Sequence, residues 1–373
     1  MRTIPFLDLK AQYDTIAPDI HRELKEVCEK NAYILGPKVT AFEDAFAKYV
    51  GAKHCIALNS GTSALHLAML CLNIKPGDEV ILPSMTFIAT AWGALYAGAK
   101  PVLVDVDPVT RTLDPTKLEA AITPRTKAII PVHLYGQPAD LNPILAIANK
   151  RGIPVIEDAA QSHGAKYHGT PVGAIGVMGC FSFYPGKNLG AYGEGGALTT
   201  NDDNIAKHAR ILRDHGQSQR YHHDEIGYNY RMDGFQGAVL GVKLPHLTEW
   251  SNQRRRVAKL YSEKLASVAR EGLLGIPSEA GWSHGVFHLY VVLAKKRDDV
   301  RAQLEKAGIQ TGLHYPIPLH LQKALGAHQG KRGDFPVSER IGDECISLPM
   351  FPELSNADAE YVADQLAQIV SRG

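Results

Sequence analysis

The stretch PVIEDAAQ, residues 154–161, has the pattern that decides the fold: a short apolar run that ends in acidic and small polar residues. Similar apolar runs recur on both sides of it. They are rich in Val and Ile and lack strict alternation, as in strands that are buried on both faces. The expected strands are residues 55–58, 79–82, 101–106, 128–132, 154–157, 180–183 and 196–199.

Helical patterns separate several of these runs, at residues 63–72, 88–97, 115–121 and 142–151. Strands that alternate with helices predict an α/β fold with a mainly parallel seven-stranded sheet and helices on both faces. Ligands of such sheets bind beyond the carboxyl ends of the strands.

The alternation of apolar runs and helical patterns ends near residue 245. Helices are expected at 247–268, 297–307 and 357–370, around an apolar run at 287–294. We therefore expect a large domain over residues 1–245 and a smaller C-terminal α+β domain over residues 246–373.

Composition narrows the class of protein. The chain has 373 residues, with 40 basic and 39 acidic side chains and a net charge of +1, which argues against a general nucleic-acid binder. No apolar run is long enough to span a membrane, and the first ten residues have no signal core. Five scattered cysteines without a CxxC pair favour a reducing compartment and indicate no metal cluster. We expect a cytoplasmic protein.

The motif NSGTSAL, residues 59–65, lies between an expected strand and an expected helix. Small hydroxyl residues and Gly61 at a helix N-terminus suit a phosphate, because free N–H groups and the helix dipole favour an anion. An ordinary helix cap gives the same pattern, so this motif alone does not distinguish the two interpretations.

Asp158 ends the expected strand at 154–157, where a buried carboxylate is costly unless it is paired. A cofactor with a protonated ring nitrogen would supply such a partner, and Gln161 lies one turn further on. A carboxylate that caps the next helix is the alternative.

Lys187 follows a strand and a Pro-Gly turn in FSFYPGKNLG, residues 181–190. An amine that attacks an aldehyde must be neutral, and burial on such a turn can lower a lysine pKa enough. An exposed loop lysine is the alternative. Phe87, after the strand at 79–82, could stack on a planar cofactor or lie in the core.

These motifs come in one order on one expected edge of the sheet, and with them the chain resembles the DegT/StrS-type sugar aminotransferases. These are pyridoxal-5′-phosphate (PLP) enzymes of fold type I. The resemblance runs nearly end to end. Its most specific segments are EDAAQ (157–161), FSFYPGKNLG (181–190), GYNYRMD (227–233) and HYPIPLH (314–320).

The resemblance implies the roles of the site residues. Lys187 and Asp158 are the expected catalytic residues. The expected cofactor contacts are Gly61 and Thr62 at the phosphate, Phe87 stacked on the ring, Asp158 at the pyridine nitrogen, Gln161 at the ring hydroxyl, Ser182 beside the phosphate and Lys187 in a Schiff base. Asn229 is expected to reach the phosphate of a neighbouring subunit's cofactor, which implies a homodimer with shared active sites.

The expected substrate contacts are Tyr184, Arg231, His314, Tyr315 and His320. Packed histidines and a structural ion pair of Arg231 are the alternatives. The implied reaction moves an amino group from glutamate to a nucleotide-linked keto sugar, at C3 of a dTDP- or UDP-hexose, in amino-sugar biosynthesis. A 4-keto-sugar or aminocyclitol aminotransferase, or a non-catalytic PLP-binding regulator, remain open.

A histidine-rich segment and an arginine-rich segment do not indicate metal or nucleic-acid sites. HHDE, residues 222–225, lacks the spacing of a zinc site and reads as a solvated or substrate-facing loop. RRR, residues 254–256, lies on an expected polar helix and reads as a solvated face.

Overall fold

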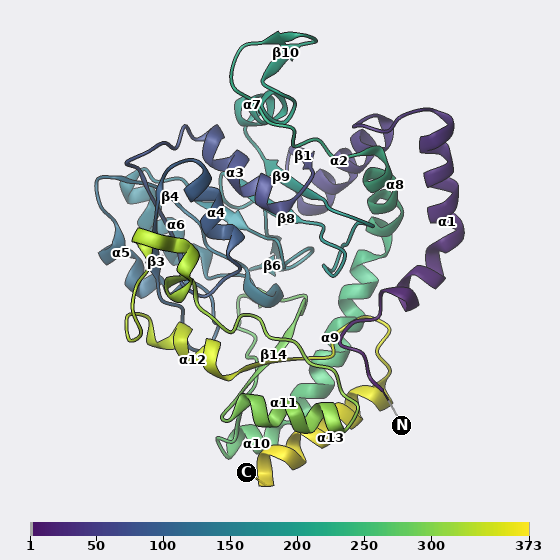
Figure 1. Ribbon diagram of the computed structural model, residues 1–373, viewed down its shortest axis with the longest axis vertical. Coiled ribbons are helices and arrows are strands. Elements are labelled where there is room, and N and C mark those ends of the chain that lie inside the picture. The colour runs from purple at the N-terminus through teal and green to yellow at the C-terminus, as the bar shows by residue number, and fades with distance from the viewer. Residues whose placement is uncertain (1–2, 373) are drawn as a thin grey trace.

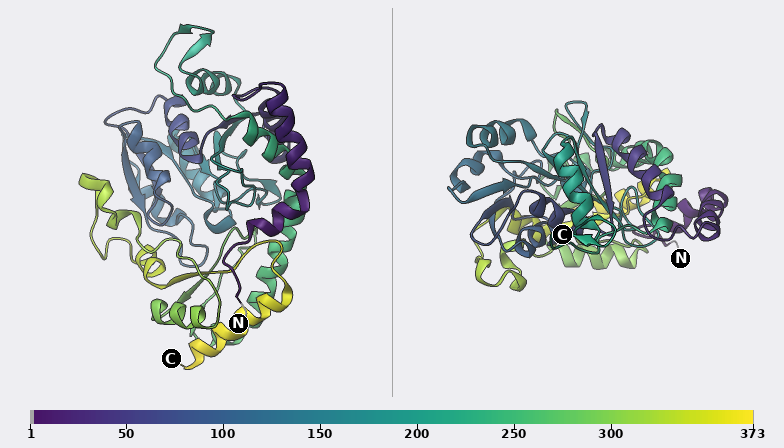
Figure 2. Two further views of the ribbon diagram at one scale, coloured as in Figure 1. Left: turned by 45° about the vertical axis from the view of Figure 1, so that its right-hand side comes forward. Right: turned by 90° about the horizontal axis from the view of Figure 1, so that it is seen from above.

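The computed structural model describes residues 3–372 (Figures 1 and 2). The central sheet has the order β3 (Lys100–Val104), β2 (Glu79–Pro83), β4 (Thr126–Ile129), β5 (Ile156–Asp158), β8 (Met178–Ser182), β9 (Gly196–Thr200) and β1 (His54–Leu58). Parallel bridges from Ile129 to Val155 and from Val132 to Asp158 join its two parts. In this sheet β9 is antiparallel to both neighbours and the other pairs are parallel, so the expected seven-stranded, mainly parallel sheet is confirmed.

Helices cover both faces because successive strand residues point to opposite sides. Ile56 and Leu58 pack in a cluster with α3 (Gly61–Cys71), α4 (Ala89–Tyr96) and α7 (Asp203–Arg213). Cys55 and Ala57 pack in another cluster with α2 (Pro37–Val50) and α8 (Gly234–Lys243). On that second face α6 (Leu141–Arg151) covers β2 and β4.

Five helices lie outside the ranges expected from the sequence: α1 (Leu9–Glu29), α2, α7, α8 and α12 (Pro336–Glu344). Helix α1 runs along the outside of the molecule (Figure 1) and buries only Gln12, Ile16, Ile20 and Val27. So few apolar positions in 21 residues make a weak periodic signal.

The C-terminal part has its own antiparallel sheet, in the order β12 (Leu274–Gly275), β14 (Tyr290–Ala294) and β15 (Cys345–Leu348). Its helices are α9 (Leu247–Lys264), α10 (Ala266–Arg270), α11 (Arg297–Lys306), α12 (Pro336–Glu344) and α13 (Asn356–Arg372). All of them except α12 contribute to one hydrophobic cluster, which Ile4 joins through a bridge to Ile309, whereas Ile341 of α12 packs in another cluster.

Short elements complete the chain. They are η1 (Pro115–Lys117), α5 (Leu118–Ala121), η2 (Leu134–Gly136), β6 (Lys166–Tyr167), β7 (Thr170–Pro171), β10 (Gln217–Gln219), β11 (His222–His223), η3 (Leu244–His246), β13 (Ser283–His284), η4 (Leu319–Leu321) and η5 (Lys323–His328). The hairpin of β10 and β11 projects beyond the body of the molecule (Figure 1).

The expectation of a solvated arginine face on α9 is wrong for Arg254. This side chain is 3% exposed, and its Nη1 donates to the carbonyl oxygens of Phe287, His288 and Met350. A guanidinium carries several donors, so one arginine can fasten the helix to two distant segments. Polarity along the helix did not reveal this, because the partners are backbone atoms far away in sequence.

Candidate active site

The turn that carries Lys187 follows directly from β8. The Lys187 N–H donates to the Tyr184 carbonyl at 2.8 Å, and the Ala191 N–H donates to the Phe183 carbonyl at 2.8 Å. The lysine side chain is half-buried. Burial lowers the pKa of Lys187 from 10.5 to about 8, and the nearby Asp158 carboxylate opposes that shift. A substantial fraction of the amine is therefore neutral, and nucleophilic, at moderately alkaline pH.

Asp158 faces the same space from the end of β5 and is 5% exposed. Its Oδ2 accepts a 2.8 Å hydrogen bond from the Thr90 hydroxyl, and its Oδ1 accepts one from the Ala160 N–H at 3.2 Å. Burial raises the pKa of Asp158, while these bonds and the positive charge of Lys187 lower it. The chain after Asp158 forms a turn instead of a helix, so the helix-cap alternative does not apply.

Gln161 links three segments that are far apart in the sequence. Its Oε1 accepts from the Tyr135 N–H at 2.7 Å, and its Nε2 donates to the Tyr315 hydroxyl at 2.9 Å. The Tyr315 ring lies 5.5 Å from that of Phe87, centroid to centroid. Phe87 is 51% exposed, which excludes the core alternative for this ring.

The N-terminus of α3 forms a cradle next to β8. Ser60 caps the helix, because its Oγ accepts from the Ser63 N–H at 3.0 Å. A Cβ on Gly61 would lie 2.7 Å from the Ser182 Cβ, so glycine is needed for this close approach. The N-terminus of α3, where Thr62 follows Gly61, thus lies directly against Ser182, and this arrangement fits a phosphate group.

The remaining residues expected at the site differ in exposure and in their partners. Tyr184 is 55% exposed and Asn229 is exposed, with its carbonyl accepting from Asn59 Nδ2 at 3.2 Å. Arg231 Nη1 donates to Asp214 Oδ1 at 2.7 Å, which is the ion pair weighed against substrate contact. His314 Nδ1 pairs with the Ser347 hydroxyl at 2.8 Å, and burial next to Lys187 lowers the pKa of His314 to about 4.

His320 is not brought together with the others. Its ring is fully buried, and Nε2 lies 3.0 Å from Glu339 Oε1. The packed-histidine alternative describes this environment, because the ring is enclosed by the C-terminal segments and offers no accessible edge to a ligand.

Two histidines near Lys187 were not identified from the sequence. Burial, then the charge of Lys187, lowers the pKa of His163 to about 3 and that of His288 well below its usual value. Both are therefore neutral near pH 7 and add no positive charge around the amine. His163 lies only two residues beyond Gln161, whereas His288 sits in an apolar run that gives no functional signal.

Two features typical of other kinds of protein are absent from residues 3–372. This part of the chain contains no helix that is long and apolar enough to cross a membrane. It also has no group of three or more His, Cys, Asp or Glu side chains arranged to hold a metal ion.

Fold and site together define a PLP-type α/β enzyme, and comparison with known proteins specifies the family. The family model for the DegT/DnrJ/EryC1/StrS aminotransferases matches residues 14–367. The chain belongs to this family.

Relatives match along almost the whole chain. The UDP-2-acetamido-2-deoxy-3-oxo-D-glucuronate aminotransferase of Pseudomonas aeruginosa is 46% identical and aligns over 97% of this chain and 99% of its own. A "pleiotropic regulatory protein" of Geobacillus stearothermophilus is 47% identical over 98% of each chain. The crystal structure of S. venezuelae DesV in complex with a ketimine intermediate has a TM-score of 0.97 and 41% identity, and covers 100% of both chains.

Proposed function

We propose that this protein is a PLP-dependent aminotransferase that transfers an amino group from glutamate to C3 of a nucleotide-linked 3-keto sugar. The observation that carries the proposal is the pair formed by a half-buried lysine amine and a buried, doubly hydrogen-bonded carboxylate at neighbouring strand ends. The relative from P. aeruginosa, whose name describes a 3-oxo sugar substrate, supports the ring position.

The residues fit the cofactor at both of its ends. Gly61, Thr62 and Ser182 would hold the phosphate, because a side chain at position 61 would fill the cradle. The Asp158 carboxylate, oriented by Thr90, would keep the ring nitrogen protonated. When bound, PLP supplies the electron sink that stabilises negative charge at the carbon losing a proton.

Lys187 has two tasks in this proposal. Its neutral amine would bind the cofactor aldehyde, and once released it would take up the proton at the α-carbon of the amino donor and return it elsewhere. The lowered pKa of Lys187 suits both tasks, since an amine of ordinary pKa would be almost fully protonated at neutral pH. The His163 and His288 rings are neutral at this pH, so they add no positive charge near this amine.

The experiment is product analysis on a panel of nucleotide sugars. Purified protein, PLP and glutamate are incubated with dTDP- and UDP-linked 3-keto and 4-keto hexoses and with a keto-cyclitol. Appearance of a 3-amino sugar is expected. A product aminated only at C4, or only from the cyclitol, would show that the proposed ring position is wrong. Absence of amination of every acceptor would contradict the proposal as a whole.

We further propose a homodimer with shared active sites in the cytoplasm. Several large apolar side chains are strongly exposed in the single chain, and the two most exposed of the described residues are Ile226 at 86% and Tyr221 at 76%. Tyr221 lies in the turn of the projecting hairpin and Ile226 follows β11, shortly before Asn229, which is the residue expected to reach a neighbouring cofactor phosphate. Exposed apolar side chains of this size are typical of subunit contacts.

The division of the chain into residues 1–245 and 246–373 is also a proposal. A hydrophobic cluster whose buried residues all follow residue 245, apart from Ile4, supports it. Leu319 and Leu325 cross this boundary, because they pack in a cluster of the large sheet.

A PLP-binding regulator is the second candidate, because the name of the Geobacillus relative describes regulation. The two candidates differ in their response to glutamate. An aminotransferase changes its visible absorbance when glutamate is added without a sugar, whereas a regulator that only holds PLP does not.

A further inference from the structure

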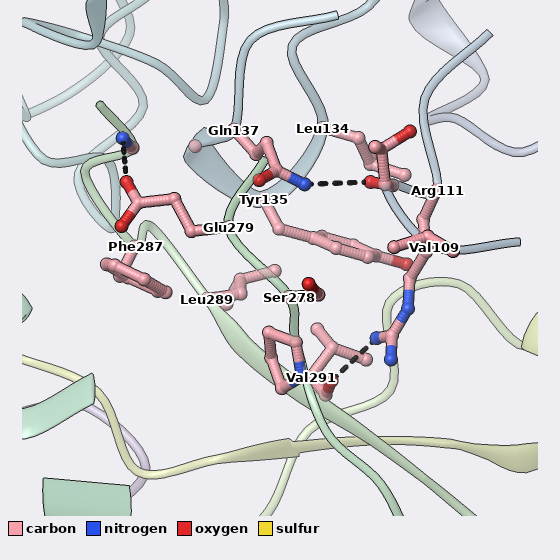
Figure 3. A pocket seen from close by; sticks show the side chains of 14 residues that line it. Val109, Arg111, Leu134, Tyr135, Gln137, Ser278, Glu279, Phe287, Leu289 and Val291 are labelled. Atoms are coloured by element: carbon pink, nitrogen blue, oxygen red, sulfur yellow. Dashed lines mark hydrogen bonds between the residues drawn. The ribbon is translucent and has the colours of Figure 1, made fainter. Parts of the chain in front are cut away.

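A cavity separate from the Lys187 site lies between the segments after β3 and β4 and the C-terminal part of the chain (Figure 3). Val109, Arg111, Tyr135 and Gln137 line it on one side, and segments 277–279 and 285–291 contribute the other. Lys187, Asp158 and Gln161 are not among the lining residues. The cavity is therefore distinct from the pocket that contains Lys187.

Arg111 is the unusual member of this lining. The residue is 5% exposed, and among residues 3–372 its guanidinium donates one hydrogen bond, from Nη1 to the Val291 carbonyl at 2.6 Å. Nε has no hydrogen-bond partner, and no carboxylate of the described chain lies within ion-pair distance of the guanidinium. A buried charge without a counterion is costly, so a negative ligand would be stabilised here.

A hydrogen-bonded turn holds Arg111 in a backbone conformation that is itself unfavourable. Arg111 has a φ of 60°, in the left-handed region, where a residue with a Cβ is disfavoured by about 1 kcal/mol. The Asp107 carboxylate accepts from the N–H groups of Val109 and Thr110, and the Asp107 carbonyl accepts from the Arg111 N–H at 2.8 Å. This turn aims the side chain at the seam between the two parts of the molecule.

The Gln137 and Glu279 side chains that also line the cavity already have hydrogen-bond partners. Gln137 donates to the Thr110 carbonyl and accepts from the Ala280 N–H. The Glu279 carboxylate binds Arg255 and the Gly285 N–H. Arg111 therefore offers the unsatisfied charge, and the neighbouring surface is apolar: Leu134, Leu289, Val291 and the rings of Tyr135 and Phe287. A carboxylate attached to a small apolar body matches this combination.

We propose that this cavity is a binding site for a small apolar carboxylate, with Arg111 as its charged contact. The site shares Tyr135 with the active site. The Tyr135 ring lines the cavity, its N–H donates to Gln161 Oε1, and its hydroxyl donates to the His314 carbonyl (Figure 3 shows the ring). A ligand that contacts this ring is thereby connected to Gln161 and His314 of the candidate active site.

The test is ligand-dependent thermal stabilisation of the PLP-loaded protein. Isobutyrate is the probe, and isobutyramide is its uncharged control of the same shape. Wild-type protein should show a rise in Tm that grows with isobutyrate concentration and a much smaller one with isobutyramide.

Two variants separate the ligand contact from general stability. Arg111→Met removes the charge and should weaken isobutyrate binding about tenfold or more, because the charged hydrogen bonds from the guanidinium to the carboxylate are lost. Ser278→Phe fills the cavity and leaves the bond from Arg111 to Val291 in place, and it should abolish the shift. An equal shift in either variant, an equal shift with isobutyramide, or no shift in the wild type would each overturn the proposal.

Discussion

The active site has two regions of opposite character. Around Asp158 and Gln161 the polar groups are buried and held by several hydrogen bonds within one chain. Around Tyr184, Asn229 and the β10–β11 hairpin the side chains are exposed. The first region is complete in a single chain, which suits a permanently bound cofactor. The second region is open to solvent, which suits the substrate and the second subunit proposed above.

The largest effect is expected in the enclosed region, from Lys187→Ala. Loss of the amine removes both the aldehyde contact and the proton acceptor, so turnover should fall by about 10⁴-fold. Steady-state rates with glutamate and the best acceptor measure this. Lys166→Ala, at an exposed lysine on β6, is the control and should keep normal rates. Normal turnover by the Lys187 variant would contradict the site.

Asp158→Asn should have the next largest effect. An amide of similar shape can still accept from Thr90 but carries no charge to keep the ring nitrogen protonated. A loss of one preorganised electrostatic group lowers kcat by about 10²–10³-fold. Visible spectra should show that PLP still binds. Asp44→Asn, at an exposed carboxylate on α2, is the control, and an equal loss there would mean that the effect is not specific.

The open region is tested by mixing two inactive variants. Asn229→Asp places a negative charge where a partner's phosphate is expected, and Lys187→Ala inactivates its own chain. Mixed and reassociated chains should recover roughly a quarter of wild-type activity, because half of the random dimers are mixed and each has one intact site. Recovery is followed as activity against mixing ratio, and its absence would show that sites are not shared.

The smallest effect concerns pH. Burial lowers the pKa of Lys187 to about 8, so the rate of PLP uptake by the cofactor-free protein should rise about tenfold per unit below pH 8 and level off above it. The unfolded chain binds the proton up to a higher pH than the folded one. This group therefore adds stability as pH rises from 8 to 10.5. Stopped-flow absorbance checks the first statement, and an uptake rate that keeps rising to pH 10 would disprove it.

Much of the sheet could be predicted from the sequence, because buried parallel strands are continuous apolar runs and their ends carry the polar motifs. The positions of Asp158 and Lys187 at neighbouring strand ends follow from that pattern. Helices α1 and α8 and the buried role of Arg254 could not be predicted in the same way. Their stabilising partners are far away in sequence, and a local pattern contains no information about them.

The sequence by itself determined the chemistry at each strand end: an acid, an amine and a glycine that opens a helix, each encoded within a few consecutive residues. Tertiary structure alone decided which distant groups meet. Gln161 reaches Tyr315 across 154 positions of the chain, and Arg111 reaches Val291 across 180. The physical reason is that burial and charge compensation depend on the packed neighbours of a group, and folding chooses those neighbours from the whole chain.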